Sequence, residues 1–343
     1  MPLKVNSWNE YDTLKTVILG NVYDLDRIPR LYEGADQVAF EKIIEETAQE
    51  LKEIRIVLEQ HGVRVLQPRQ PKTYHSIEQD QTVQHSPLMN MRDFYLAYGE
   101  WFFMTFGSYS TRRYQHFWAE DIVNQLITDG NIVVSANEPN LEILDWNKYK
   151  LPQESWGRAY EESYADKNLI HTACLLKYNT IAFMRQQPGT EIGKAWLTKL
   201  LSLQGIKIVE VSGSGHLDGC HSILNKKTVL VNTQNIRPWA GFKNIIRYDD
   251  NSKDQKFRDI ANQVAISRNP TEWLSEWRGY AQEFDNAINC LSLSPNKVML
   301  SVYDKNLDRQ LKNIGIDTVY VKWSNRVFWE GGLHCITCDI ERN

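Results

Sequence analysis

The amino-acid sequence predicts an α/β fold, and three observations support that prediction. A helix, a glycine and a short β-branched strand follow one another in this order five times along the 343 residues. Further strand-like runs lie between these units, and no Pro-, Gly- or Ser-rich linker interrupts the chain. Modules arranged about an axis and an ordinary α/β sheet both alternate helices with strands, so periodicity alone leaves these two architectures equally open. Because linkers are absent, we expect a single domain over residues 1–343.

The first unit shows the pattern most clearly. Residues 35–60 carry apolar side chains at helical spacing and stop at Gly62, and the β-rich run 63–66 follows at once. The other units are residues 119–128 with Gly130 and 131–134, 194–203 with Gly205 and 206–209, a shorter copy in which Gly241 precedes Ile245 and Ile246, and 307–313 with Gly315 and 318–321. The strand-like runs between the units cover residues 16–19, 180–183, 228–231 and 297–300.

Composition and charge argue against several classes of protein. Charged residues make up 24% of the chain and the mean hydropathy is −0.48, as is typical of a soluble globule rather than a disordered chain. The formal net charge of −4 gives no broad phosphate-binding face, so we expect no nucleic-acid partner. No run approaches the roughly 18 apolar residues that cross a bilayer, and no secretion signal opens the chain, so we expect no membrane partner.

The five cysteines are few for the chain length and odd in number, so we expect reduced thiols and a cytoplasmic protein. Cys335 and Cys338 form a Cys-x-x-Cys pair. A zinc site normally needs a second pair, and a redox dithiol normally opens a thioredoxin-like helix. The sequence supplies neither context, so we expect no metal and no cofactor. Cys338, Cys290 and Cys174 are best explained as small buried hydrophobes.

Three clusters carry ionisable side chains, at residues 90–93, 212–219 and 330–339, and the second and third combine them with glycine. In the second cluster, His216 and Asp218 are two residues apart and would point the same way from an extended strand, lining one cavity with a base and a carboxylate. A glycine turn with a solvated aspartate and a half-buried histidine explains this segment equally well. The cluster does not have the spacing of a phosphate-binding loop.

In the third cluster two glycines precede a His-Cys pair, so the chain can place Cys335 at a tight bend where its sulfur is reachable. A cysteine becomes a useful nucleophile as the thiolate, which needs a nearby positive charge or a base. His216 is the candidate for that base, through space. The two residues together predict nucleophilic catalysis.

Taken in chain order, these clusters resemble the amidinotransferase family, which includes the arginine:glycine amidinotransferases and the arginine:inosamine-phosphate amidinotransferases of antibiotic and cyanotoxin biosynthesis. The similarity covers nearly the whole chain, and the terminal motif is its most specific part. The segments that carry it are VNSWNEYD (5–12), ILG (18–20), MRD (91–93), GHLD (215–218), IRP (236–238) and GGLHCITCD (331–339).

The resemblance implies a five-module, pseudo-symmetric α/β-propeller with the active site on its central axis. It also implies transfer of an amidino group from arginine, or a related guanidine, to an amine acceptor without a cofactor. Cys335 would attack the central carbon of the donor guanidinium and carry the amidino group as a thioether. His216 would protonate the departing amine and later take a proton from the acceptor.

The resemblance also assigns residues to substrate binding. Asp93 and Asp218 match the family's two carboxylates, which hold the planar guanidinium by paired, charge-assisted hydrogen bonds. Two buried acids would repel each other beside a neutral ligand, so their joint presence favours a cationic substrate. Arg237 stands where the family places an arginine that binds a substrate carboxylate.

Two positions depart from the family pattern. The family usually has an aspartate that orients and charges the catalytic histidine, and the aligned position here is His171. A neutral imidazole stabilises an imidazolium less than a carboxylate does, so we expect a weaker general acid unless Asp166 or Glu162 substitutes. Gly215 replaces a bulkier residue, which would leave room for an acceptor larger than glycine.

The sequence therefore predicts a cysteine-dependent amidinotransferase of specialised metabolism, with small-molecule substrates as partners and a homodimer as the oligomer common in such a family. The same residues would make a hydrolase if water took the amidino group, or a cyclising enzyme if an internal amine did. A catalytically silent, ligand-binding propeller is a further alternative, motivated by the missing relay aspartate.

Overall fold

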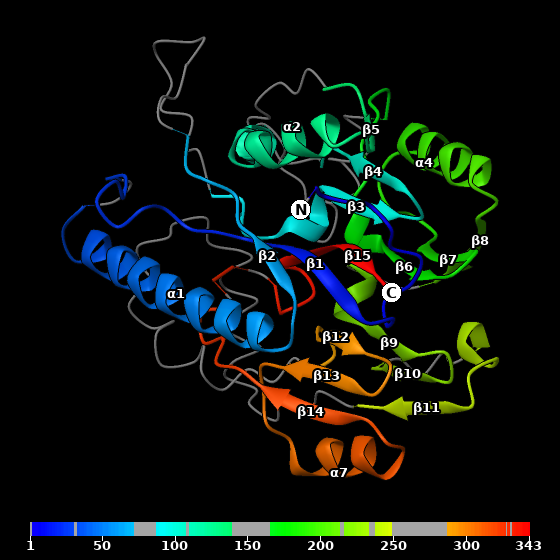
Figure 1. Ribbon diagram of the computed structural model, residues 1–343. Coiled ribbons are helices and arrows are strands. Elements are labelled where there is room, and N and C mark those ends of the chain that lie inside the picture. The colour runs from blue at the N-terminus through cyan, green and yellow to red at the C-terminus, as the bar shows by residue number, and fades with distance from the viewer. Residues whose placement is uncertain are drawn as a thin grey trace, which may run out of the picture.

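The structure is a computed structural model, shown in Figure 1. It describes residues 2–30, 33–71, 87–107, 110–138, 165–212, 216–232, 237–248, 287–326, 328–329 and 331–343. Gly215 and Glu162, which the sequence singled out, lie outside the described residues.

The described strands form five separate three-stranded sheets, so the continuous α/β sheet that periodicity left open is excluded for this part of the chain. In each sheet the middle strand pairs antiparallel with one neighbour and parallel with the other. The sheets are β15 (Thr337–Arg342), β1 (Leu14–Leu19) and β2 (Arg64–Leu66); β3 (Tyr95–Tyr98), β4 (Trp101–Met104) and β5 (Ile132–Ser135); β6 (Leu175–Tyr178), β7 (Ile181–Arg185) and β8 (Lys207–Val211); β9 (His221–Asn225), β10 (Thr228–Val231) and β11 (Asn244–Arg247); and β12 (Leu291–Ser294), β13 (Lys297–Leu300) and β14 (Asp317–Tyr320).

In each sheet a helical connection leads from the middle strand to its parallel neighbour. Parallel strands need such a crossover, because a tight hairpin can join only antiparallel strands. The helices lie on the outside of the sheets, whereas strand β15 lies in the middle, between the other sheets (Figure 1). The connecting helices are α1 (Gly34–Gln60), η2 (Ser110–Ala119) followed by α2 (Glu120–Thr128), α4 (Glu191–Leu203), η7 (Arg237–Trp239) and α7 (Lys305–Asn313). The short helices η1 (Met91–Asp93), η5 (Thr172–Cys174) and η6 (Leu217–Gly219) precede β3, β6 and β9.

The predicted order of helix, glycine and strand is confirmed in four units at the glycine itself. Gly62, Gly130, Gly205 and Gly315 have φ values of +77°, +84°, +75° and +80°, and each follows a helix and precedes the parallel strand. Glycine adopts this left-handed backbone without the clash that a Cβ would cause, so it ends the helix and turns the chain into the strand. The unit around Gly241 differs, because its connection contains the short helix η7 instead of an α-helix.

Apolar side chains pack each helix onto its sheet. In the first unit, Ile44, Leu51 and Leu58 of α1 belong to one buried cluster with Val17 and Ile18 of β1.

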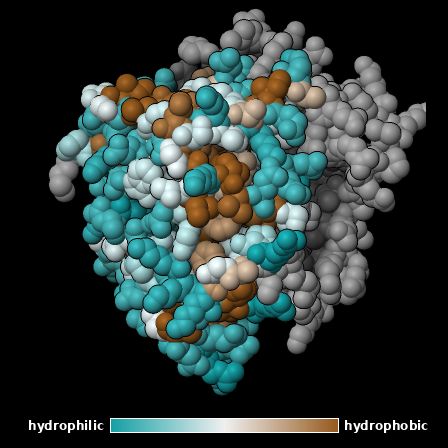
Figure 2. All heavy atoms as spheres, turned by 90° about the vertical axis from the view of Figure 1, so that its right-hand side faces the viewer, coloured by the Kyte–Doolittle hydropathy of each residue, from teal (hydrophilic) through white to brown (hydrophobic). Residues whose placement is uncertain are grey.

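On the face that Figure 2 turns toward the viewer, which carries α4 and β8, apolar groups are interleaved with hydrophilic ones. In the part of the chain that is described, no helix has the length and apolar content that crossing a bilayer requires.

A buried ionic network joins the sheets to one another. The Asp339 carboxylate of β15 lies 2.8 Å from Nζ of Lys177 and 2.8 Å from Nη2 of Arg92, and Nε of Arg342 donates to it as well. All four side chains are 0–1% exposed. Burial alone would raise the pKa of Asp339, but the charges of Lys177, Arg342 and Arg92 hold that pKa well below its usual range. The charged network therefore fixes β15 against η1 and β6.

The left-handed glycines give a test of this fold with a matched control. A Cβ at Gly205 or at Gly241 would meet no atom within 4 Å, but only Gly205 has a positive φ, of +75°. Gly205→Ala should lower the free energy of unfolding by about 1–2 kcal/mol, the cost of left-handed backbone for a residue with a Cβ. Gly241→Ala should leave it unchanged or raise it slightly. Urea denaturation of both variants measures the difference, and equal losses would contradict the assignment of the helix-ending glycine.

Candidate active site

The Cys335 side chain lies in the turn before β15 and is 5% exposed. Its Sγ accepts a hydrogen bond from Nδ2 of Asn289 at 2.9 Å and donates to Oδ2 of Asp218 at 3.3 Å. Oδ1 of Asn289 accepts from the backbone amides of His334 and Cys335 at 2.9 and 3.0 Å. One side chain thus holds both the sulfur and the backbone of the turn.

The two glycines before this turn are required by close packing. A Cβ on Gly331 would lie 2.5 Å from Oδ1 of Asn90 and 2.8 Å from Cβ of Cys335. A Cβ on Gly332 would lie 2.7 Å from Cβ of Asn289. The sequence predicted a tight bend at these glycines, and the structure adds that they let the backbone approach the residues that hold Cys335.

The surroundings of Cys335 keep its thiol protonated. Burial has the largest effect, and it raises the pKa of the thiol; the negative charges of Asp218 and Asp93 raise it further. The hydrogen bond from Asn289 acts in the opposite direction, and the resulting pKa is well above the usual value. A positive charge placed between the two carboxylates would offset the part of this barrier that the carboxylates cause, but not the part caused by burial.

Asp218 belongs to a chain of buried groups that the sequence analysis did not find. Its Oδ2 lies 2.8 Å from Nδ1 of His334, and Nε2 of His334 lies 3.2 Å from Oε2 of Glu10. Burial and the charge of Arg92 lower the pKa of His334, but its hydrogen bonds to both carboxylates outweigh them and raise it. Glu10 has its pKa lowered to about 2, because Lys177, Arg92 and His334 together outweigh burial.

Asp93 faces a second group of side chains. Nη1 of Arg112 lies 2.6 Å from Oδ2 of Asp93, and the Arg112 guanidinium lies 4.5 Å from the centre of the Phe94 ring. Nδ1 of His216 lies 3.4 Å from Oδ1 of Asp93. Burial raises the pKa of Asp93, but Arg112, His216 and His171 outweigh it, so Asp93 is ionised.

Each acid therefore already contacts a basic side chain of the protein, Arg112 at Asp93 and His334 at Asp218. These contacts still leave both carboxylates able to raise the pKa of the Cys335 thiol. The preference of these two acids for a cationic substrate stays a prediction.

The structure brings some, but not all, of the predicted site residues close to Cys335. His216 faces Asp93, and Asp93 also acts on the pKa of Cys335, so these three residues surround one region. The hydrogen-bonding partners described for the Cys335 sulfur are Asn289 and Asp218, rather than His216. Arg237 is exposed at the start of η7 and takes no part in the contacts above, so its role stays a prediction.

His171 lies beside His216, with ring centres 5.2 Å apart and ring planes tilted by 37°. Its pKa is lowered to about 3, first by burial and then by the charge of His216. His171 is therefore a neutral neighbour and supplies no charge to an imidazolium. Asp166 does not replace the missing carboxylate, because its side chain is 71% exposed and pairs with Lys167 at 2.7 Å. The described carboxylate that faces His216 is Asp93.

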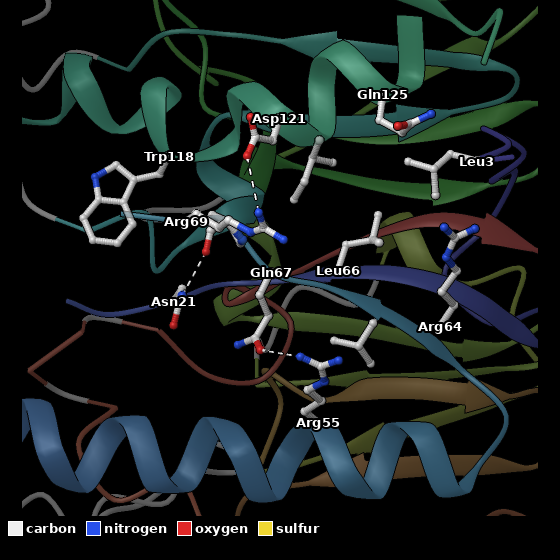
Figure 3. A pocket seen from close by; sticks show the side chains of 13 residues that line it. Leu3, Asn21, Arg55, Arg64, Leu66, Gln67, Arg69, Trp118, Asp121 and Gln125 are labelled. Carbon is white, nitrogen blue, oxygen red and sulfur yellow. Dashed lines mark hydrogen bonds and ion pairs between the residues drawn. The ribbon is translucent and has the colours of Figure 1, made fainter. Parts of the chain in front are cut away.

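A separate pocket of about 380 Å³ lies between β2 and α2 (Figure 3). Three arginines line it; Arg69 faces Asp121 at 3.9 Å and Arg55 donates to Gln67 at 3.3 Å. None of the candidate catalytic residues lines this pocket, so it is distinct from the active site.

No protein-family model and no curated protein matches the sequence. Solved structures match nearly its full length. The chain resembles SxtG, an amidinotransferase of the saxitoxin biosynthetic pathway from Microseira wollei, with a TM-score of 0.70 and 18% identity over 99% of this chain and 97% of that one. It also resembles the inosamine-phosphate amidinotransferase StrB1 from Streptomyces griseus, with a TM-score of 0.68 and 19% identity over 99% and 97% of the two chains.

The chain has the amidinotransferase fold. The resemblance to amidinotransferases that the motifs predicted is thereby confirmed. The same fold occurs in DDAH from Pseudomonas aeruginosa, which matches with a TM-score of 0.58 and 12% identity over 95% of this chain and 99% of that one. Because transferases and DDAH share this arrangement of sheets, the fold alone leaves the reaction open.

The electrostatic environment of Cys335 predicts a measurable change in its reactivity. Asp218→Asn removes a negative charge that raises the thiol pKa, so more thiolate should be present at pH 8 and iodoacetamide should alkylate Cys335 faster, by about tenfold for each pKa unit lost. In the unaltered protein the alkylation rate should still be rising above pH 9. Peptide mass spectrometry locates the modification at Cys335.

Asp166→Asn is the control, because Asp166 is exposed and pairs with Lys167. It should leave the alkylation rate of Cys335 unchanged. An Asp218→Asn variant that reacts no faster than this control would contradict the assigned role of Asp218.

Proposed function

We propose that this chain is an amidinotransferase that moves an amidino group from arginine, or a related guanidine, to an amine acceptor through a covalent amidino intermediate on Cys335. The observation that supports this most directly is one buried thiol under the influence of two carboxylates, Asp93 and Asp218, one of which faces His216. A planar cation with hydrogen-bond donors on both edges matches two carboxylates better than a neutral substrate does.

The first half of the reaction begins when the donor guanidinium enters. Its positive charge offsets the two carboxylates that raise the thiol pKa, so binding itself promotes loss of the thiol proton, which His216 accepts. The Cys335 thiolate then attacks the central carbon of the guanidinium. The bond from that carbon to the substrate nitrogen breaks, and His216 returns the proton to the departing amine.

The second half reverses these roles. The acceptor amine attacks the carbon of the amidino-thioether, and His216 takes a proton from the attacking nitrogen. The bond between carbon and sulfur breaks, and Cys335 leaves as a thiolate. The first product departs before the acceptor reacts, so ping-pong kinetics follow. Asn289 donates a hydrogen bond to the sulfur throughout, which favours the thiolate in both halves.

We also propose that the five units close into a propeller around this site. The carboxyl-terminal strand β15 pairs with β1 and thus completes the first sheet with the last part of the chain. Cys335, Asp218 and Asp93 come from segments that precede strands of different sheets. The two amidinotransferases with this fold act, by their names, in saxitoxin biosynthesis and on inosamine phosphate, which supports an acceptor from specialised metabolism.

A cysteine adduct tests the proposal directly. Incubation with arginine should add the mass of one amidino group to the intact protein, and peptide mapping should place it on Cys335. Cys335→Ala should form no adduct, whereas Cys290→Ala, which alters another buried cysteine, should still form it. Formation of the adduct should release one equivalent of ornithine, and further ornithine release that requires an added amine indicates the transferase. Release of urea, or of citrulline together with ammonia, indicates a hydrolase. Absence of an adduct with every guanidine tested would contradict the enzymatic proposal.

The neutral neighbour of His216 gives a prediction for pH dependence. The ring centres of His171 and His216 are 5.2 Å apart, so His171→Asp places a carboxylate close to His216. An opposite charge at such a distance stabilises an imidazolium by about 1–3 pKa units. The basic limb of the kcat profile should therefore move to higher pH. His171→Asn removes the ring without adding charge and should not move that limb upward. Equal shifts in both variants would show that charge at position 171 is not the cause.

A further inference from the structure

Two imidazoles and one carboxylate converge beside the candidate active site. Asp93, His171 and His216 each offer one ligand atom, and these atoms all lie within 4.8 Å of one another. Asp93 ends η1, His171 immediately precedes η5 and His216 immediately precedes η6, so three separate segments bring the atoms together. Among the described residues this is the group of histidine, cysteine and acidic side chains whose geometry fits a metal ion.

The Asp93 carboxylate supplies independent support. Its Oδ2 is taken by Arg112 at 2.6 Å, whereas its Oδ1, on the side of His216, is buried and has no hydrogen-bond donor among the described residues. A buried carboxylate oxygen without a donor is costly, and such atoms in folded proteins usually face an ion or another bound group. This oxygen is aimed at the two histidine rings.

The spacing is compatible with a bound ion after small side-chain movements. Metal–ligand bonds of about 2.0–2.2 Å in tetrahedral geometry place ligand atoms roughly 3.4 Å apart. Oδ1 of Asp93 and Nδ1 of His216 are already 3.4 Å apart. The His216 side chain is 35% exposed and can turn, while His171 is packed against Gly107, so closure onto an ion needs adjustment mainly at His216.

We propose that Asp93, His171 and His216 bind a divalent transition-metal ion, for which zinc is the best match, and that the bound ion inhibits amidino transfer. Two imidazoles and a carboxylate are a common ligand set for zinc, with the remaining position open to solvent. The ion takes the His216 lone pair, which proton transfer needs, and the Asp93 oxygen that faces the donor guanidinium. Metal binding stands without the proposed function, whereas inhibition rests on it.

This site differs from the one that the sequence analysis considered. For Cys335 and Cys338 the sequence predicted no metal, because no second ligand pair accompanies them. The present cluster contains no cysteine, and its His171 is the residue that replaces the family's relay aspartate. Three positions separated by about 45 to 80 residues carry no spacing motif that a sequence search recognises.

Binding is tested on the full-length protein after treatment with a chelator. Isothermal titration calorimetry measures Zn²⁺ affinity, and the visible absorption of bound Co²⁺ reports coordination by nitrogen and oxygen. We expect one Zn²⁺ per chain, with at least a tenfold loss of affinity in His171→Phe, which keeps a ring but removes the ligand atom. The control His61→Phe alters an exposed histidine after α1 and should keep the affinity.

Further variants keep the proposal falsifiable if His171→Phe does not fold. His216→Gln alters the more exposed ligand and should weaken Co²⁺ binding in the same way. Cys335→Ser should retain Co²⁺ binding with an unchanged spectrum. The metal proposal is overturned if no Zn²⁺ binds, if His171→Phe or His216→Gln binds like His61→Phe, or if Cys335→Ser abolishes binding.

The two proposals fail separately. An arginine adduct in chelator-treated protein that binds no Co²⁺ overturns the metal site alone. Co²⁺ binding without any guanidine adduct overturns the proposed function alone. Where both occur, saturating Zn²⁺ should suppress adduct formation at least tenfold in the unaltered protein and less in His171→Phe. Equal suppression in the two proteins would contradict inhibition through this site.

Discussion

The buried carboxylate of Asp339 is the group on which the geometry of the site depends. It faces Arg92, Lys177 and Arg342, all within its fully buried surroundings. Arg92 is adjacent to Asp93, and Asp339 follows Cys335 by four residues, so one ionic network helps to set the relative positions of Asp93 and Cys335. Removing one partner from such a network leaves an uncompensated buried charge, at a cost of about 3–5 kcal/mol. Charge therefore joins the sheets alongside the apolar cluster that also spans them.

The same network governs the chemistry of the thiol. Glu10 lies 3.9 Å from Arg92 and 3.2 Å from His334, and His334 in turn contacts Asp218, so fixed cations reach the candidate site in one continuous chain. Burial raises the pKa of Asp93, but Arg112, His216 and His171 outweigh it and hold that pKa below its usual range. Burial raises the pKa of the Cys335 thiol, and the charges of Asp218 and Asp93 raise it further. A further positive charge beside these carboxylates would lower the pKa of the thiol. Burial, which is unfavourable for a thiolate, would thus make the reactivity of Cys335 depend on the charge of a bound ligand.

Local patterns in the sequence were enough to predict the repeated units, because a helix that ends at a left-handed glycine is determined by neighbouring residues. Cys335 and Asp218 were found because each lies in a glycine-rich motif. Asn289 and Arg112 were missed, since neither has a local signal and their partners are distant in the sequence: Cys335 is 46 residues from Asn289. Asp166 was a reasonable substitute relay acid from its position alone, but the fold leaves it exposed beside Lys167.

The residue at position 171 decides whether the surroundings of His216 favour a proton on its ring or a bound metal ion. An aspartate there would place two acids around His216, an arrangement that favours a proton on the imidazole. The histidine instead places two imidazoles beside one acid, and its ring remains neutral because burial lowers its pKa to about 3. A neutral imidazole gives little help to a neighbouring imidazolium, yet its lone pair can bind a metal ion. The replacement therefore weakens the arrangement for holding a proton and supplies the ligand that a transition metal prefers.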